Sequence, residues 1–170
     1  MNYSNTFFTK NTIFGIGVGL SFILSSFLLF KTGKNVIFNP QASNISLLLS
    51  IAGAYIGTRT LREETLNGFI SFRKALGSAV YIILVGSFIH AIFIFELYKA
   101  VPELMENYKS MLHMMLEEAY KGQDMLATMQ TVMANAVSPL LIAITDFINK
   151  IFTGIIFSLL IAALLKRRKV

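Results

Sequence analysis

Cysteine is absent from the chain, and charged residues are scarce. The first absence excludes disulfide bonds, thiolate metal sites and cysteine nucleophiles. Charged residues make up 14% of the 170 residues and hydrophobic residues 55%, whereas a soluble domain is about 25% charged. This composition argues against a water-soluble globule, a disordered chain and a coiled coil.

Signatures of catalysis and of metal binding are also missing. The sequence contains no H-E-x-x-H, no G-x-S-x-G and no P-loop. Histidine occurs only at His90 and His113, so a His-rich metal site cannot be assembled. We therefore expect no enzyme activity, no catalytic or metal-binding residues and no cofactor.

Long apolar segments are the main positive feature of the sequence. A membrane-spanning helix needs about 20 apolar residues, and the segments 12–30 and 75–95 contain no Asp, Glu, Lys or Arg. The segment 40–58 has a shorter apolar centre. Asn39 followed by Pro40 is a typical helix start, however, and a helix that begins there is long enough to span. The last apolar run, 151–165, is too short to span, so we expect the membrane helix to begin earlier, at about residue 140. We predict an all-α membrane protein with one domain, 1–170, and spans at about 12–30, 40–58, 75–95 and 140–165.

Basic residues predict how these spans are oriented. Four spans place both termini on one side, together with Lys10, the connector 59–74 and the basic tail 166–169. An excess of Lys and Arg marks the cytoplasmic side, so we expect cytoplasmic N- and C-termini. No A-x-A-like cleavage site follows the first segment, which favours a retained anchor over a cleaved signal peptide. The basic residues behind the net charge of +6 then lie at the ends of spans, where they contact anionic lipid headgroups. We therefore expect no nucleic-acid partner.

Residues 96–138 form the one sizeable part predicted to lie outside the membrane. Apolar residues spaced three and four apart indicate an amphipathic helix; they are Val101, Leu104, Tyr108, Met111 and Met115. Gly122 is a typical helix end, and Ser138 with Pro139 marks the entry into the last span. We predict an extracytoplasmic amphipathic helical hairpin between the third and fourth spans. Its many methionines favour adaptable packing, and whether it binds a protein, a lipid or a metal stays open.

Glycines four residues apart predict close packing of helices in the membrane. The pairs are Gly15 with Gly19 in the first span and Gly53 with Gly57 in the second, and Gly154 begins a small-residue ridge in the fourth. Small side chains let helix backbones approach each other in lipid. The pattern leaves open whether the neighbouring helix belongs to the same chain or to another copy.

Segment 75–95 contains one histidine, His90, and no Asp, Glu, Lys or Arg. Counted from the predicted inner ends of the spans, Lys150 lies at a similar depth and Asp146 one turn further out. Buried ionisable residues often mark transport pathways, so the three residues are candidates for a proton relay. The second interpretation is structural: an interhelical hydrogen bond near the outer boundary, with Lys150 reaching to water and pairing with Asp146.

The connector after the second predicted span carries a cluster of charges. Arg59, Arg62, Glu63 and Glu64 lie within six positions, and Arg59 with Glu63 has the spacing of an ion pair on a helix. Transport gates use such clusters, but solvated helix ends do as well. Asn67 and Gly68 then indicate a break before the next helix.

The residues from Arg62 to Gly77, REETLNGFISFRKALG, resemble a bacterial family of small four-span inner-membrane proteins classed as a domain of unknown function. The Gly-rich first span, Tyr98 and Pro102 after the third span, and the basic tail are similar as well. The resemblance implies a multi-pass protein of the bacterial inner membrane. It implies no activity and no catalytic residue.

Two functions stay open at this point. The first is a non-catalytic protein-interaction or small-subunit role, with the lipid bilayer and a homo-oligomer or another membrane protein as partners. The alternative is an oligomeric transporter or channel element that uses His90, Asp146 and Lys150.

Overall fold

The structure is a computed structural model that describes residues 3–33, 36–37, 39–121 and 125–167. In these residues the regular elements are helices: α1 (Tyr3–Lys31), α2 (Pro40–Thr65), α3 (Phe72–Ala100), α4 (Pro102–Ala119), α5 (Met125–Ala136) and α6 (Pro139–Leu165). An isolated antiparallel bridge joins Ile70 to Arg167. The predicted all-α class is confirmed.

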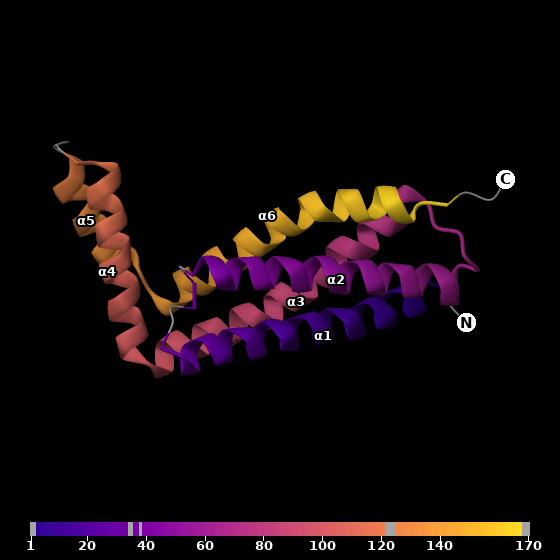
Figure 1. Ribbon diagram of the computed structural model, residues 1–170, viewed down its shortest axis with the longest axis horizontal. Coiled ribbons are helices and arrows are strands. Elements are labelled where there is room, and N and C mark those ends of the chain that lie inside the picture. The colour runs from indigo at the N-terminus through magenta and orange to yellow at the C-terminus, as the bar shows by residue number, and fades with distance from the viewer. Residues whose placement is uncertain (1–2, 34–35, 38, 122–124, 168–170) are drawn as a thin grey trace.

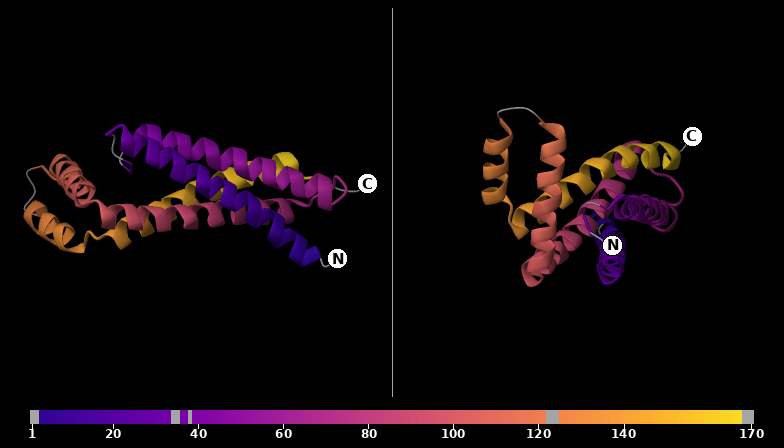
Figure 2. Two further views of the ribbon diagram at one scale, coloured as in Figure 1. Left: turned by 90° about the horizontal axis from the view of Figure 1, so that it is seen from below. Right: turned by 60° about the vertical axis from the view of Figure 1, so that its left-hand side comes forward.

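Four of the helices form an elongated bundle. α1, α2, α3 and α6 run side by side along the long axis, and both termini lie at one end (Figure 1). α2 and α3 each pack against the other three helices of the bundle, and the contacts of α3 with α1 and α6 are the most extensive. α4 and α5 pack on each other as a hairpin across the opposite end of the bundle (Figure 2).

Local signals explain where the helices begin. The Asn39 side chain accepts a hydrogen bond from the Gln41 N–H at 2.9 Å, with Pro40 in the first turn, as predicted. Ser138 caps α6 in the same way, before Pro139. The predicted break between α2 and α3 is also confirmed, because Asn67 and Gly68 have φ angles of 52° and 83°, a left-handed conformation that ends a helix. The predicted helix end at Gly122 lies outside the described residues.

Three of the described helices are long and apolar enough to cross a membrane. Thr6–Lys31, Phe72–Ala100 and Pro139–Leu165 have 26, 29 and 27 residues and mean hydropathies of 2.2, 2.2 and 2.1. α2 also has 26 residues but does not reach this hydropathy, because it carries serines along its length and charges from Arg59 onward. By length and composition three of the four predicted spans are therefore supported, and the predicted span 40–58 is not confirmed.

The outer surface of the bundle is apolar, as expected for a protein in lipid. Phe152 and Leu164 of α6 are 70% and 75% exposed. Conversely, several of the residues buried between the helices are polar, including Asn11, Thr58 and His90. This distribution of apolar residues outside and polar residues inside fits a membrane protein, in which lipid tails solvate the apolar surface.

Candidate functional site

A polar cavity lies between α1, α2, α3 and α6, in the half of the bundle nearest the hairpin. Its volume is about 150 Å³. Its polar lining consists of Ser26, Ser43, Ser46, Ser50, His90, Asp146, Asn149, Lys150 and Thr153. The apolar residues Val36 and Ile37, in the connection between α1 and α2, also line the cavity. The three ionisable residues singled out in the sequence thus line one space.

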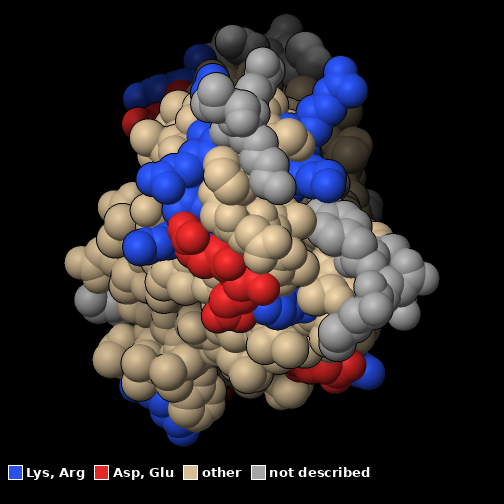
Figure 3. Space-filling view, turned by 90° about the vertical axis from the view of Figure 1, so that its right-hand side faces the viewer, with Lys and Arg blue, Asp and Glu red and all other residues tan. Residues whose placement is uncertain are grey.

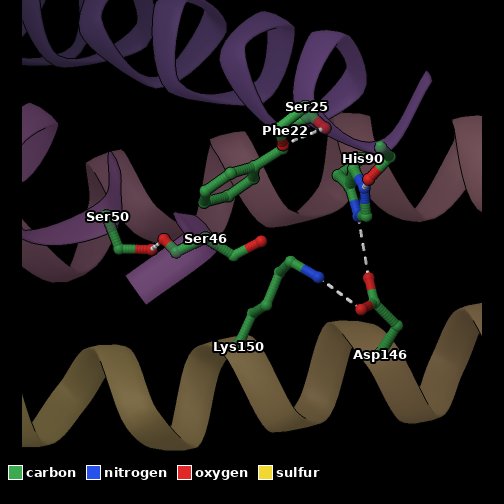
Figure 4. A network of polar contacts seen from close by, with 8 residues as sticks. Phe22, Ser25, Ser46, Ser50, His90, Asp146 and Lys150 are labelled. Atoms are coloured by element: carbon green, nitrogen blue, oxygen red, sulfur yellow. Dashed lines mark hydrogen bonds and ion pairs between the residues drawn. The ribbon is translucent and has the colours of Figure 1, made fainter. Parts of the chain in front are cut away.

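Asp146 is held by partners from two helices. His90 Nδ1 of α3 lies 2.8 Å from Asp146 Oδ2, and the Lys150 ammonium, one turn along α6, donates to Oδ1. Figure 4 shows Asp146 and Lys150 extending from α6 toward His90 and Phe22. The His90 side chain is 3% exposed, Asp146 11% and Lys150 12%. A buried carboxylate needs such partners, because an unpaired charge in a low-dielectric interior is costly.

The hydrogen bonds define the tautomer of His90. An ionised carboxylate can only accept, so Nδ1 carries the proton that faces Asp146. The other nitrogen, Nε2, lies 2.8 Å from the Ser26 hydroxyl and accepts a hydrogen bond from it when the ring is neutral. If the ring becomes protonated, rotation of that hydroxyl converts Ser26 from donor to acceptor. The network can therefore hold His90 in either protonation state without losing a hydrogen bond.

Phe22 of α1 contacts both His90 and Lys150. Its ring makes an edge contact with the His90 ring at 5.6 Å, and the Lys150 ammonium lies 5.6 Å from the centre of the Phe22 ring. An aromatic face attracts a cation. Phe22 thus positions the ammonium beside the cavity without adding a charge.

The candidate packing glycines lie at contacts between helices of the same chain. A Cβ at Gly15 would come within 2.6 Å of Val85 Cβ on α3, and one at Gly19 within 2.9 Å of Ile89 Cβ. The other three show the same crowding: Gly53 against Val18, Gly57 against Ile82 and Phe14, and Gly154 against Ile83. The question left open by the sequence is answered for these positions, because their close neighbours are intramolecular.

The structure also shows polar residues that sequence reasoning missed. Ser26 was not singled out, because a single serine in an apolar segment gives no signal of its partner. A second network lies nearer the termini, where Thr58 donates to Ser78 at 3.1 Å and Ser78 to Asn11 at 2.8 Å. These three residues are fully buried and link α1, α2 and α3. Asn11 lies directly before the predicted first span. Its position next to an apolar segment was the one feature of the sequence that could have indicated a buried polar residue.

Ion pairs gather at the end that carries the termini (Figure 3). Glu63 is paired with Arg62, rather than with Arg59 as the helical spacing predicted, and Lys10 of α1 pairs with Glu64 at 2.7 Å. The hydrogen bond from Arg62 lowers the pKa of the Glu63 carboxyl below its ordinary value. These contacts tie the ends of α1 and α2 together.

The fold and the cavity define an all-helical protein with membrane-like helices, between which several polar residues are buried. Residues 13–167 match the model of a protein family of unknown function, DUF4199. The chain belongs to this family, which covers nearly its whole length. No curated protein and no solved structure matches it.

Proposed function

We propose that the chain crosses a bacterial inner membrane four times, with α2 as the fourth span. α2 has 26 residues, and at about 1.5 Å per residue it is long enough to cross about 30 Å of hydrocarbon. It runs beside the three apolar helices (Figure 1). Its low hydropathy is explained by position, because Ser50 and Thr58 are buried inside the bundle and do not meet lipid.

The proposed orientation places both termini in the cytoplasm and the hairpin of α4 and α5 outside. The end with the termini carries Lys10, Arg59, Arg62 and Lys166, which the positive-inside rule places in the cytoplasm. The cavity then lies toward the outer face.

We propose that the cavity serves as a transport element through which protons move. The observation that carries this proposal is the hydrogen-bonded series Ser26–His90–Asp146–Lys150, buried in an apolar bundle and bordering an open space. Ionisable groups are costly at such a position and typically serve ion or proton movement. A purely structural contact between α3 and α6 would need neither a cavity nor three ionisable groups.

Transport across the full membrane favours an oligomer. On the cytoplasmic side of the cavity the bundle interior contains the apolar residues Ala54, Ile83 and Ile161, as well as the buried polar network of Asn11, Thr58 and Ser78. Asn149 and Thr153 of α6 line the cavity and are exposed. Exposed polar side chains are unfavourable against lipid, so a second copy of the chain is the proposed neighbour at this position.

We further propose that the site does not act as a hydrolase, although Ser26, His90 and Asp146 follow the order of a serine-hydrolase triad. Ser26 lies within α1, where main-chain N–H groups donate to carbonyls of their own helix. A hydrolase needs free donors beside its nucleophile to stabilise the oxyanion. Proton transfer requires no such donors.

Proton flux in proteoliposomes tests the transport proposal. The full-length chain is reconstituted with a pH-sensitive dye inside, and a potassium diffusion potential drives proton entry. Replacing Asp146→Asn or His90→Ala is expected to reduce the flux by at least about tenfold, because each breaks the relay. The control Glu118→Gln, on the exposed face of α4, leaves the flux unchanged. Undiminished flux in both relay variants would remove these residues from the mechanism.

A protein-interaction role is the second candidate, favoured by the exposed hairpin. Met114 and Met115 of α4 are 56% and 53% exposed, and methionine surfaces adapt to varied partners. The glycines no longer support this role, since they pack within the chain. Crosslinking from Met115→Cys in native membranes is expected to capture a partner if this role exists, and an unlinked monomer would count against it.

A further inference from the structure

The cavity is lined by one anion, one cation and one titratable ring. Asp146 and Lys150 come from α6 and His90 from α3. The lining residues of α1 and α2 carry no charge: they are serines, such as Ser26 and Ser46, or apolar residues. With His90 neutral, Asp146 and Lys150 cancel. The lining is therefore electrically neutral overall, which a low-dielectric interior favours.

The one anionic group of the lining is already hydrogen bonded through both of its oxygens, while the ammonium still has N–H donors available. Both carboxylate oxygens of Asp146 are hydrogen bonded, one to His90 and one to Lys150. An ammonium has three N–H donors, and Lys150 gives one of them to Asp146. Within the described residues, no group of three or more His, Cys, Asp or Glu side chains could hold a metal ion. A bound ligand would thus meet a positive charge and hydroxyl donors, a setting that favours an anion over a cation.

The size of the cavity limits the ligand. A volume of about 150 Å³ is comparable to cavities that hold benzene, a molecule of about six heavy atoms, in other proteins. Apolar side chains at Val36, Ala42 and Leu47 line part of the wall. The space suits a small anion with an apolar part, such as a short carboxylate.

We propose that the cavity binds a small monovalent anion together with one proton. The proton enters the coupled His90–Asp146 pair, which weakens the hold of Asp146 on the Lys150 ammonium and frees that ammonium to bind the anion. Either charge alone would leave the buried site charged, whereas the two together keep it neutral. This inference rests on the proposed transport role and gives that role a substrate class, a small anion carried with a proton.

Calorimetry on the full-length chain in detergent at mildly acidic pH tests the inference. Acetate and nitrate are the probes, and each titration is repeated in two buffers that differ in ionisation enthalpy, so that proton uptake is counted. The expected result is binding of an anion with about one proton taken up for each anion. Nitrate stays ionised at this pH, so uptake measured with nitrate reports on the protein.

Three variants separate a binding site from a structural ion pair. Lys150→Met is expected to weaken binding at least about tenfold, because the cation is lost. Asp146→Asn keeps anion binding but loses most of the proton uptake, since the ammonium is already free. Lys31→Met is the matched control and leaves binding unchanged, because Lys31 lies over the Phe27 ring in the same kind of contact but outside the cavity lining.

Several outcomes would overturn the inference. Folded wild-type protein that binds neither anion, or that binds without proton uptake, contradicts it, as does full binding by Lys150→Met. If that variant does not fold, the double variant Asp146→Asn/Lys150→Met, which removes both charges, must fold and fail to bind. Proton flux in liposomes without anion binding would leave the transport role standing and remove the anion. Proton-coupled anion binding without flux would leave the anion site standing and remove the transport role.

Discussion

The side chain of Arg62, in the last turn of α2, donates a hydrogen bond from its Nη1 to the main-chain carbonyl of Leu165, the last residue of α6, at 3.2 Å. The last carbonyls of a helix have no partner within the helix and carry partial negative charge. α6 has no basic residue in its own last turn. Arg62, which is 6% exposed, supplies the missing donor from another helix.

Removing this contact is expected to destabilise the bundle. Arg62→Gln leaves the Leu165 carbonyl without its charged donor, which should cost about 1–3 kcal/mol of unfolding free energy. The measurement is a thermal or denaturant unfolding curve in detergent. Arg59→Gln is the matched control, because Arg59 is exposed, and it should change stability by less than about 0.5 kcal/mol. Equal effects in the two variants would contradict the role of Arg62.

Stability should depend on pH through Glu63. The hydrogen bond from Arg62 lowers the pKa of Glu63 below 4.5, the ordinary value. A depressed pKa means that the stabilisation is fully present above the ordinary value and is lost as the pH falls through the lower value of the folded state. We therefore expect the wild type to melt at a higher temperature than Glu63→Gln near neutral pH, and this difference to become smaller as the pH falls below about 4.5. A difference independent of pH would show that the ion pair contributes nothing.

Two glycines on α1 should respond in opposite ways to the same substitution. Gly15→Ala places a methyl group 2.6 Å from Val85 Cβ, so the helices must separate, at a cost of about 1–3 kcal/mol. A Cβ at Gly17 meets nothing within 4 Å, and Gly17→Ala should be neutral or stabilise by up to about 1 kcal/mol through helix propensity. Unfolding curves of the two variants test the close approach of α1 and α3.

Labelling of single cysteines tests whether α2 crosses the membrane. The chain has no native cysteine, so Asn44→Cys and Glu64→Cys each introduce one thiol, at the two ends of α2. We expect a membrane-impermeant maleimide added to intact cells to label Asn44→Cys, and to reach Glu64→Cys after lysis. Labelling of both from the same side would mean that α2 lies on the membrane surface and that three helices span.

Features determined by neighbouring residues could be predicted from the sequence. Asn39 with Pro40 and Ser138 with Pro139 begin helices, and Asn67 with Gly68 breaks one, because caps and turns depend on residues a few positions apart. The similar depth of His90 and Lys150 could be estimated as well, because the rise of a helix is constant.

Contacts between distant residues could not be predicted in this way. Ser26 was missed because its partner His90 is 64 positions away. The spacing of Arg59 and Glu63 suggested an ion pair, but the structure pairs Glu63 with Arg62 and Glu64 with Lys10. Exposed pairs on a helix are weak, so the arrangement of the whole bundle selects the partners.

The sequence by itself determined that the chain is helical and that several of its helices are apolar enough for a membrane, because these properties follow from composition and local order. The tertiary structure alone decided that the glycines face helices of the same chain, that α2 buries Ser50, and that His90, Asp146 and Lys150 line one cavity with Ser26. The physical reason is that rotation of a helix about its axis determines which face is buried, and that rotation is fixed by packing against all neighbouring helices together.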